Sequence, residues 1–353
     1  MGEPSLKEVS TIGLDIAKNV FQVHGADRAG AVVIRRALRR SQMLAWFAKL
    51  PRCLVGIEAC GPAHYWAREL RQLGHEVRLI PPAYAKAYVR RNKNDPADAE
   101  AICEAVSRPA MRFVAIKTEQ QQALAAIHRV RDLLIKQRTM LKNQLRGLLA
   151  EFGIVAAQGR RGLIELLAIL SDGEDRRIPS LLREGLKAVM ETLHGIERKL
   201  EGVDRQIVTT GRENATCRHL ITAPGYGPIL SSAMAALVTD PGAFKRGSDF
   251  AASLGLVPRQ DGTDGKVRLG PISKRGNGYL RRLLVNSLPS GLTRWGATSL
   301  IKAQHARRDP WVARLLAVKP RKVVAVALAN KLARIGWALM RRQEDFRGRP
   351  ATA

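Results

Sequence analysis

The chain has 353 residues with 59 Lys+Arg and 31 Asp+Glu, a net charge of +28. This excess favours a polyanionic partner, because each phosphate that a basic side chain neutralises releases a counterion. The four cysteines show no CxxC spacing, which disfavours a zinc site or disulfide framework and favours a reducing cytoplasm. We find no apolar run long enough to span a bilayer and no signal peptide, so no membrane partner is expected.

The charge is concentrated in the last third of the chain. Residues 216–353 hold 24 Lys+Arg against 7 Asp+Glu, whereas residues 1–115 and 116–215 carry net charges of only +7 and +4. The last third is therefore the strongest candidate for a nucleic-acid surface. A solvated basic face without a partner is the alternative.

The first third has the pattern of an α/β domain, with short β-rich runs between turn signals and amphipathic segments. The expected elements are strands over 10–17, 19–25 and 31–36, a helix over 41–50, a strand over 53–59, a helix over 62–73, a strand over 75–82 and a helix over 95–106. This β-β-β-α-β-α-β-α order matches the ribonuclease H-like layout, although other α/β folds share the pattern.

The middle third is predicted to be helical. A first helix covers 119–152, with Arg131 and Arg138 interrupting its apolar seam. In a second helix, apolar residues alternate at spacings of four and three, the signature of a coiled coil. The positions in this heptad seam are Leu182, Leu186, Val189, Leu193, Ile196, Leu200, Val203 and Ile207. The seam predicts self-association of the chain, with a hairpin between the two helices as the alternative.

The last third begins with the turn "PGYG", at residues 224–227, between two helical segments. Such a turn either aims backbone N–H groups at a phosphate or simply connects two helices. We then expect a loop over 258–277 and helices over 278–288 and 320–340.

Four carboxylates occupy the places where a ribonuclease H-like layout holds metal. Asp15 lies in the apolar run "IGLDIA", Glu58 ends "LVGIE", and Asp95 and Asp98 begin the last helix of the first third. A carboxylate in a buried strand costs several kcal/mol unless it is paired or binds a cation. Oxygen ligands suit Mg²⁺, with Mn²⁺ as an alternative. Two such ions can assist phosphoryl transfer by activating the nucleophile and stabilising the leaving oxygen.

Asp95 also has a simpler interpretation. Asp followed by Pro96 is typical of a helix N-cap, and Asp98 would then favour the helix dipole. The two interpretations are compatible, because the spacing of three residues puts both carboxylates on one helix face. The joint occurrence of all four carboxylates favours a metal site. We interpret His24, His64 and His75 as structural.

Several motifs together resemble a known family, the DEDD transposases of the insertion-sequence 110 and 1111 group. The matching segments are "IGLDIAKNVFQVHG", "VGIEACGPAHYWARELRQLGHEVRLIPPAYAKAYV", "KNDPADAEAI", "PGYGPILSSAM", "FAASLGLVPRQ", "LGPISKRGNGYLRRLL" and "KPRKVVAVALANKLARIGWAL". They run from about residue 10 to residue 341. The resemblance implies an α/β plus α chain, with a RuvC-like domain over 1–115, a helical coiled-coil insert over 116–215 and a mostly helical transposase domain over 216–353.

The same resemblance implies an RNA-guided DNA recombinase that cleaves and rejoins donor and target DNA, with a non-coding guide RNA encoded by its own element. Asp15, Glu58, Asp95 and Asp98 are implied to hold Mg²⁺. The working form is implied to be a homodimer or homotetramer in which domains of different subunits share a site. Such an enzyme would act on the nucleoid in a bacterial cytoplasm.

One departure from the family concerns the nucleophile. The family's serine precedes "GGK", but the corresponding segment here is "DGTDGK", so Gly262 takes the place of the serine. Thr263 is the hydroxyl residue of this segment, and its methyl group hinders attack. Ser273 is a weaker candidate. Thr263 substitutes for the serine, another residue of the loop has been altered to do so, or strand transfer is impaired while nucleic-acid binding persists.

Basic residues around this segment fit contacts with phosphates. They are Lys266, Arg268, Lys274 and Arg275, with Arg281 and Arg282 on the following helix. Two other functions remain open, namely a RuvC-type structure-specific nuclease that uses water as its nucleophile and a non-catalytic RNA- and DNA-binding protein.

Overall fold

The computed structural model describes residues 8–88, 95–263, 266–286, 296–302 and 309–347. The chain divides into two compact units, residues 1–122 and 123–353, and each has its own hydrophobic core. The boundary lies in the first turn of α5 (Glu119–Ala150).

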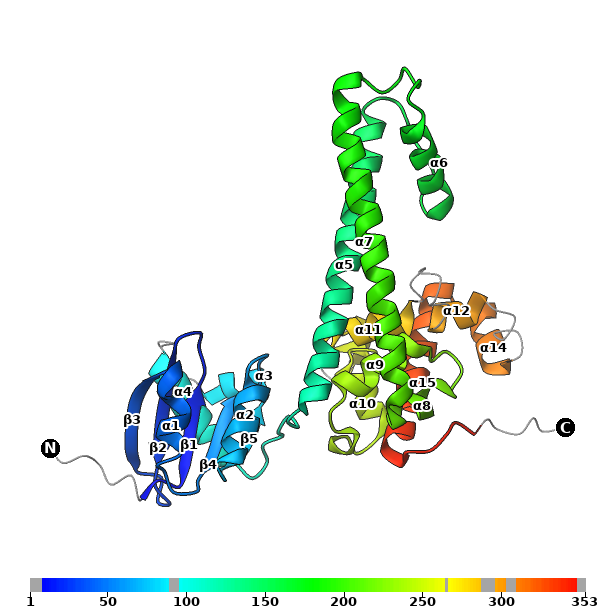
Figure 1. Cartoon of the computed structure of the whole chain (residues 1–353). Helices are drawn as coiled ribbons and strands as arrows, with labels where there is room; N and C mark the ends of the chain where they lie inside the picture. The colour runs from blue at the N-terminus through cyan, green and yellow to red at the C-terminus, as the bar shows by residue number, and fades with distance from the viewer. Residues whose placement is uncertain (1–7, 89–94, 264–265, 287–295, 303–308, 348–353) are drawn as a thin grey trace. The chain divides into compact units, whose positions relative to one another are not determined.

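The first unit contains one five-stranded sheet (Figure 1). Its elements are β1 (Thr11–Asp15), β2 (Val20–Ala26), β3 (Val32–Arg39), α1 (Met43–Phe47), β4 (Leu54–Glu58), α2 (Ala63–Gln72), β5 (Glu76–Ile80), α3 (Pro82–Ala85) and α4 (Asp95–Val106). The predicted order is confirmed, with the short α3 added. The strand order is β3-β2-β1-β4-β5, in which β2 is antiparallel to β1 and β3, and β4 is parallel to β1 and β5. This arrangement is compatible with a ribonuclease H-like domain.

The two faces of the sheet are packed differently. On one face, Leu14 and Ile57 join the core formed with α1 and α2. On the other face α4 lies against β1 and β4, above Gly13 and Gly56, which are direct neighbours in the register. A methyl group on Gly13 would overlap the backbone of α4, and one on Gly56 would lie 2.7 Å from Cβ of Val106. The two glycines therefore allow α4 to approach the strands directly.

Substitution of Gly13 by alanine tests this contact. We expect Gly13→Ala to lower the free energy of unfolding by about 3 kcal/mol, the upper range for an overpacked core, because α4 must move away from β1. Chemical denaturation measures the loss. Gly61→Ala is the matched control, since a Cβ at Gly61 meets no atom within 4 Å. Equal stability of the two variants would contradict the role given to Gly13.

The second unit is almost entirely helical. Besides most of α5, its elements are α6 (Arg160–Ser171), α7 (Ser180–Glu213), α8 (Ala215–Ile221), α9 (Pro228–Leu237), α10 (Gly247–Ser253), β6 (Pro258–Thr263), β7 (Lys266–Ile272), α11 (Gly278–Val285), α12 (Ala297–Lys302), α14 (Pro310–Val318) and α15 (Arg321–Arg342). The core of this unit surrounds α15, which packs against α8, α10, α11, α12 and α14.

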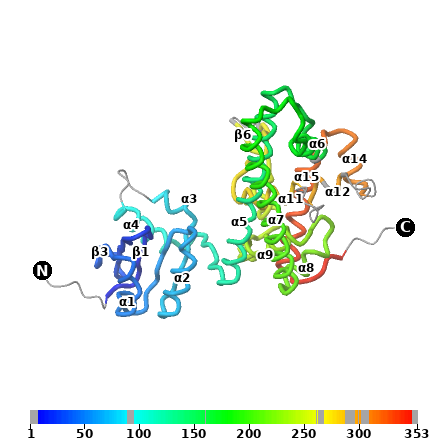
Figure 2. Tube along the Cα trace, turned by 45° about the horizontal axis from the view of Figure 1, so that its top comes forward, coloured from blue at the N-terminus to red at the C-terminus, as the bar shows by residue number. Residues whose placement is uncertain are grey.

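The long helices α5 and α7 run side by side (Figure 2). Two ion pairs show that they are antiparallel. Arg131 of α5 pairs with Asp204 of α7, and Lys142, further along α5, pairs with Glu197, which is earlier in α7. In the heptad seam, Leu186 and Leu193 share a buried cluster with Leu145 of α5, and Ile207 joins the core around α15. The seam is thus buried within the chain, as in the hairpin alternative, and by itself it no longer indicates self-association.

The arginine that interrupts the apolar seam of α5 has a buried partner. Arg131 is fully buried, and its Nε donates to Asp204 Oδ1 on α7 at 2.5 Å. One turn earlier, the ring nitrogens of His128 lie 3.0 Å from Tyr279 Oη on α11 and 3.0 Å from Ser232 Oγ on α9. Removing one partner of a buried ion pair costs several kcal/mol, so this polar network specifies how four helices pack.

The network predicts that acid destabilises the second unit. Burial, aided by the charge of Arg131, lowers the pKa of His128 to about 3. The unfolded chain takes up a proton on this histidine near pH 6.5 and the folded chain does not, so stability falls as the pH drops from about 6.5 towards 3. At pH 5 the expected loss is about 2 kcal/mol relative to pH 7.5. Urea unfolding at several pH values measures this loss.

The variant His128→Gln tests whether this histidine is the cause. It should be less stable than the wild type at pH 7.5, and its stability should depend less on pH. An unchanged pH dependence would show that His128 is not the group responsible.

Two expectations for the last third need correction or completion. Residues 258–277 are not a loop, because β6 and β7 form a hairpin in which Thr263 pairs with Lys266. The intervening Asp264-Gly265 is a common hairpin turn sequence, a signal that the sequence analysis missed. The "PGYG" turn is anchored in the core of the unit, and its phosphate-binding role stays a prediction. Its Tyr226 is fully buried and donates its hydroxyl hydrogen to the carbonyl oxygen of Leu332 at 2.9 Å.

Helix α15 also corrects the expectation about apolar runs. It has 22 residues, and an 18-residue window has a mean hydropathy of 1.5, so by length and composition alone it could cross a membrane. A buried core helix passes the same test. Leu328, Leu332 and Leu339 of α15 belong to the core of the second unit, which accounts for the apolar composition.

Candidate functional site

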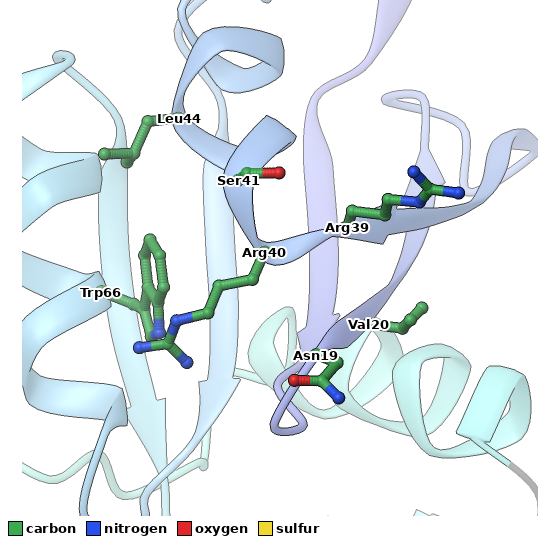
Figure 3. Close-up of a pocket in the computed structure, with 7 residues that line it drawn as sticks. All are labelled: Asn19, Val20, Arg39, Arg40, Ser41, Leu44 and Trp66. Atoms are coloured by element: carbon green, nitrogen blue, oxygen red, sulfur yellow. The ribbon is translucent and has the colours of Figure 1, made fainter.

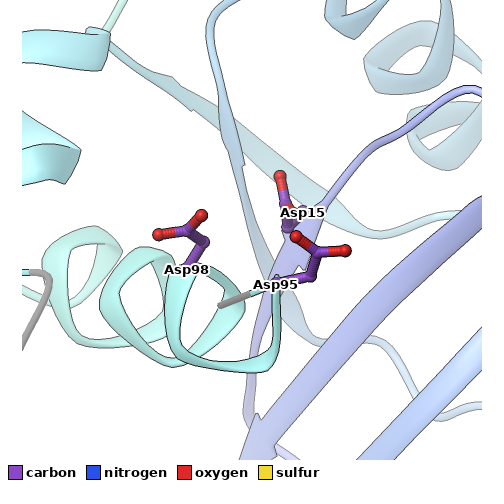
Figure 4. A group of neighbouring side chains, drawn as sticks. All are labelled: Asp15, Asp95 and Asp98. Carbon is purple, nitrogen blue, oxygen red and sulfur yellow. The ribbon is translucent and has the colours of Figure 1, made fainter. Parts of the chain in front are cut away.

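Three carboxylates meet at one edge of the sheet in the first unit. Asp15 is the last residue of β1, and Asp95 and Asp98 lie in the first turn of α4 (Figure 4). One oxygen from each lies within 4.8 Å of the others. Asp15 follows Gly13 by two residues and so shares the sheet face covered by α4. The close approach of α4 at Gly13 is therefore what brings its first turn to Asp15.

Glu58 lies beside this cluster but is not part of it. Leu14 pairs with Ile57, so Asp15 and Glu58 occupy the next positions on two neighbouring parallel strands. The pKa of the Cys60 thiol is raised by partial burial and, to a smaller extent, by the negative charges of Glu58 and Asp15. Both carboxylates thus act on the same small region.

Asp15 and Glu58 are less buried than the sequence suggested. Asp15 and Glu58 were expected inside buried strands, but each ends its strand and is half-buried. Their desolvation is smaller than expected. The stronger indication of a cation is the proximity of Asp15, Asp95 and Asp98, because three like charges repel one another and a hard cation between them removes the repulsion.

The helix that carries two of these residues begins at Asp95 itself. The residues before Asp95 lie outside the described part, so the cap interpretation stays a prediction. Asp95 and Asp98 still favour the positive end of the helix dipole. The spacing that suggested a cap thus places both carboxylates towards Asp15 (Figure 4).

Gly13 and Gly56 position the site but were not among its predicted residues. A signal was present, because each glycine precedes its carboxylate by two residues, in "GLD" and in "GIE". In a strand, this spacing puts glycine and carboxylate on the same face. The pattern indicates a strand that a helix approaches closely next to an acidic group.

The predicted nucleophile and several basic residues lie on or beside the β6–β7 hairpin. Gly262 is exposed near the end of β6, and Thr263 is paired with Lys266. The side chains of Thr263 and Lys266 lie outside the described part. Beyond them the hairpin and its following turn carry exposed basic side chains, namely Arg268, Lys274 and Arg275. Ser273 is half-buried, and its backbone N–H donates to the carbonyl oxygen of Val257 at 2.9 Å.

The two arginines predicted on the next helix also contact groups of the protein itself, and Arg282 remains exposed. Arg281 Nη1 donates to the carbonyl oxygens of Leu254 at 2.8 Å and Arg275 at 2.9 Å. Arg282 Nη2 donates to Asp132 Oδ1 on α5 at 2.6 Å. These contacts tie the hairpin and α11 to the rest of the unit. Arg268, Lys274, Arg275 and Arg282 are exposed and Arg281 is half-buried, and all five stay predicted phosphate contacts.

Comparison with known proteins gives consistent matches over both units. A transposase family model matches residues 12–154, and the model described as "Transposase IS116/IS110/IS902 family" matches residues 217–303. A probable family 20 transposase of Pseudomonas aeruginosa is 48% identical over 96% of this chain and 99% of its own length. The transposases of elements IS1328 from Yersinia enterocolitica and IS1111A from Coxiella burnetii are 39% and 36% identical over at least 95% of this chain and 93% of their own lengths.

The chain is therefore a transposase, an enzyme that recombines DNA. It belongs to the IS116/IS110/IS902 family, as the resemblance in its motifs indicated. DEDD transposases normally use a divalent metal, and the cluster of Asp15, Asp95 and Asp98 supplies the oxygen ligands that such an ion prefers.

The cluster predicts that Mg²⁺ stabilises the first unit. At a concentration about tenfold above Kd, the gain is about 1.4 kcal/mol. Asp98→Asn should abolish the gain, and without metal it should melt higher than the wild type, because one of three repelling charges is removed. Thermal melting with Mg²⁺ and with EDTA measures both effects.

The matched control for this experiment is Glu104→Gln. Glu104 is on the same helix and pairs with the exposed Arg108. This variant should keep the response to Mg²⁺. An equal response in Asp98→Asn would show that Mg²⁺ binds elsewhere.

Proposed function

We propose that this transposase is an RNA-guided DNA recombinase of the ribonuclease H-like type. In this proposal residues 1–115 form the RuvC-like domain, 116–215 the helical coiled-coil insert and 216–353 the transposase domain. The partners are donor DNA, target DNA and a guide RNA encoded by the element. The working form is a homodimer or homotetramer in the bacterial cytoplasm, associated with the nucleoid.

The observation that supports this function best is the meeting of Asp15, Asp95 and Asp98 within 4.8 Å at the edge of the sheet. These residues, with Glu58 beside them, would hold Mg²⁺ or Mn²⁺. When bound, the ion supplies positive charge that stabilises the phosphoryl oxygens during transfer. The carboxylates themselves would bind the ion and fix its position at the end of β1.

The nucleophile in this proposal is the hydroxyl of Thr263. Thr263 ends β6 and is paired with Lys266, so a basic residue lies directly across the hairpin. Attack by the hydroxyl oxygen on the scissile phosphorus would form a phosphothreonine link and break the bond from phosphorus to the leaving DNA oxygen, which takes up the threonine's proton. The basic side chains of Lys266, Arg268, Lys274 and Arg275 would hold neighbouring phosphates.

A second function is favoured by one observation, the glycine at position 262 where the family has its serine. Without a hydroxyl nucleophile, water would attack at the same carboxylates and the chain would be a RuvC-type nuclease. If neither reaction occurs, the chain is a binding protein for RNA and DNA.

Covalent capture distinguishes these functions. The protein is incubated with the element's RNA, both DNAs and Mg²⁺, and a protein–DNA adduct is sought on a denaturing gel. We expect an adduct in the wild type that falls at least about 100-fold in Thr263→Ala, the scale on which loss of a reacting group registers. Thr263→Ser should react faster, because it removes the hindering methyl group.

Three further variants complete the experiment. Ser273→Ala is the matched hydroxyl control and should keep the adduct. Asp98→Asn should lose the adduct and keep RNA binding. Cleaved DNA without an adduct would establish the nuclease, and binding without cleavage would establish the binding protein. An adduct that appears only in Gly262→Ser would show that the missing serine disables the natural chain.

A further inference from the structure

A hollow of about 670 Å³ opens at one corner of the sheet in the first unit (Figure 3). Its wall combines an indole with two arginines and two small polar side chains. The lining residues are Asn19, Val20, Arg39, Arg40, Ser41, Leu44 and Trp66. No function described above uses these residues, and they lie outside the strongly basic last third of the chain.

The position of Arg40 is fixed while its donors stay open. The guanidinium carbon lies 5.0 Å from the ring centroid of Trp66 and 6.0 Å from that of Phe21. The backbone N–H of Arg40 donates to the carbonyl oxygen of Asn19 at 2.9 Å. Among the described residues no acceptor meets the guanidinium N–H groups, and the side chain is exposed. Stacking on aromatic rings holds Arg40 in place and leaves its N–H groups free for an anion.

Trp66 restricts the kind of ligand that fits the hollow. It is only 4% exposed, and its buried Nε1 has no hydrogen-bond partner within the part of the chain that the structure describes. Because this nitrogen is closed to solvent, Trp66 supports Arg40 and does not donate to a ligand in the hollow. A nucleic-acid base cannot stack on this indole, because the ring is buried and Arg40 lies over it. The hollow therefore suits the oxygens of a phosphate and not the face of a base.

The register of the strands places this hollow at the same edge of the sheet as the carboxylates. Asp15 pairs with Gln22, and Val20 pairs with Arg39. The end of β1, the start of β2 and the end of β3 thus share one edge. A strand of nucleic acid with one phosphate near Asp15 would have further phosphates along this edge.

We propose that the hollow binds a backbone phosphate of the DNA strand that lies across the carboxylate edge, with Arg39 and Arg40 as its main ligands. Such a contact is independent of base sequence and fixes the register of the strand. The link to catalysis rests on the proposed function of the carboxylates, whereas the phosphate site rests on the hollow alone. The shared chemistry is a phosphodiester, so the guide RNA is the competing source.

The test compares two double variants of the full-length protein in EDTA, where no chemistry occurs. One is Arg39→Gln with Arg40→Gln. The matched control is Arg28→Gln with Arg52→Gln, which removes the same charge from exposed arginines at the opposite edge of the sheet. Fluorescence anisotropy measures binding of labelled single-stranded and duplex DNA over a range of salt concentrations. We expect the first variant to weaken binding about 5-fold and to reduce the salt slope by about 1, the contribution of one phosphate contact, and the control to do neither.

A second measurement uses the wild type, so that its result cannot be explained by misfolding of the double variant. Arginine-specific labelling with phenylglyoxal, read by mass spectrometry, should show Arg39 and Arg40 protected by DNA and Arg28 and Arg52 unprotected. Equal salt slopes for the two double variants, or protection by guide RNA alone, would overturn the proposal. Either result leaves the metal-dependent chemistry untouched, because that chemistry is judged by the adduct and by Asp98→Asn.

Discussion

The contact between α4 and the sheet is the constraint on which the candidate site depends. Gly13 and Gly56 lie side by side on β1 and β4, and any Cβ there would collide with α4. Without side chains beneath it, the helix lies low enough for its first turn to reach the end of β1. The acidic cluster is therefore a consequence of packing. The glycines determine where the carboxylates meet, and the carboxylates determine what can bind there.

In the second unit, the long helices carry charged residues in otherwise apolar seams, and these residues need buried partners. Arg131 would be costly in the core by itself, but Asp204 lies opposite it and the pair is fully buried. His128, kept neutral by burial, connects the same region to α9 and α11. These polar contacts hold the α5–α7 hairpin and the helix after the β6–β7 hairpin in one arrangement. The position of the predicted nucleophile loop thus depends on a buried polar network far from it in sequence.

The sequence could not show which groups of the protein some of the predicted residues contact. Arg281 and Arg282 have the composition of a phosphate-binding pair, and their guanidinium groups also contact the carbonyl oxygens of Leu254 and Arg275 and the carboxylate of Asp132. A basic residue looks the same in sequence whether its partner is a phosphate or a carbonyl oxygen. The heptad seam of α7 had the same ambiguity, since a second copy and α5 offer similar apolar surfaces. Spacing along one helix determines which face is apolar and does not determine what covers it.

The sequence by itself determined the order of strands and helices in the first unit, the positions of the four carboxylates and membership of the transposase family. Period-two and period-three-to-four patterns, glycine and proline signals and acidic residues are local properties that the chain carries wherever it folds. Only the tertiary structure decided that three of the carboxylates meet while Glu58 stands beside them, and that the seam of α7 is covered by α5. It alone revealed the hollow under Arg40. These features arise where residues distant in sequence come together, and the distance between such residues depends on packing that no local pattern records.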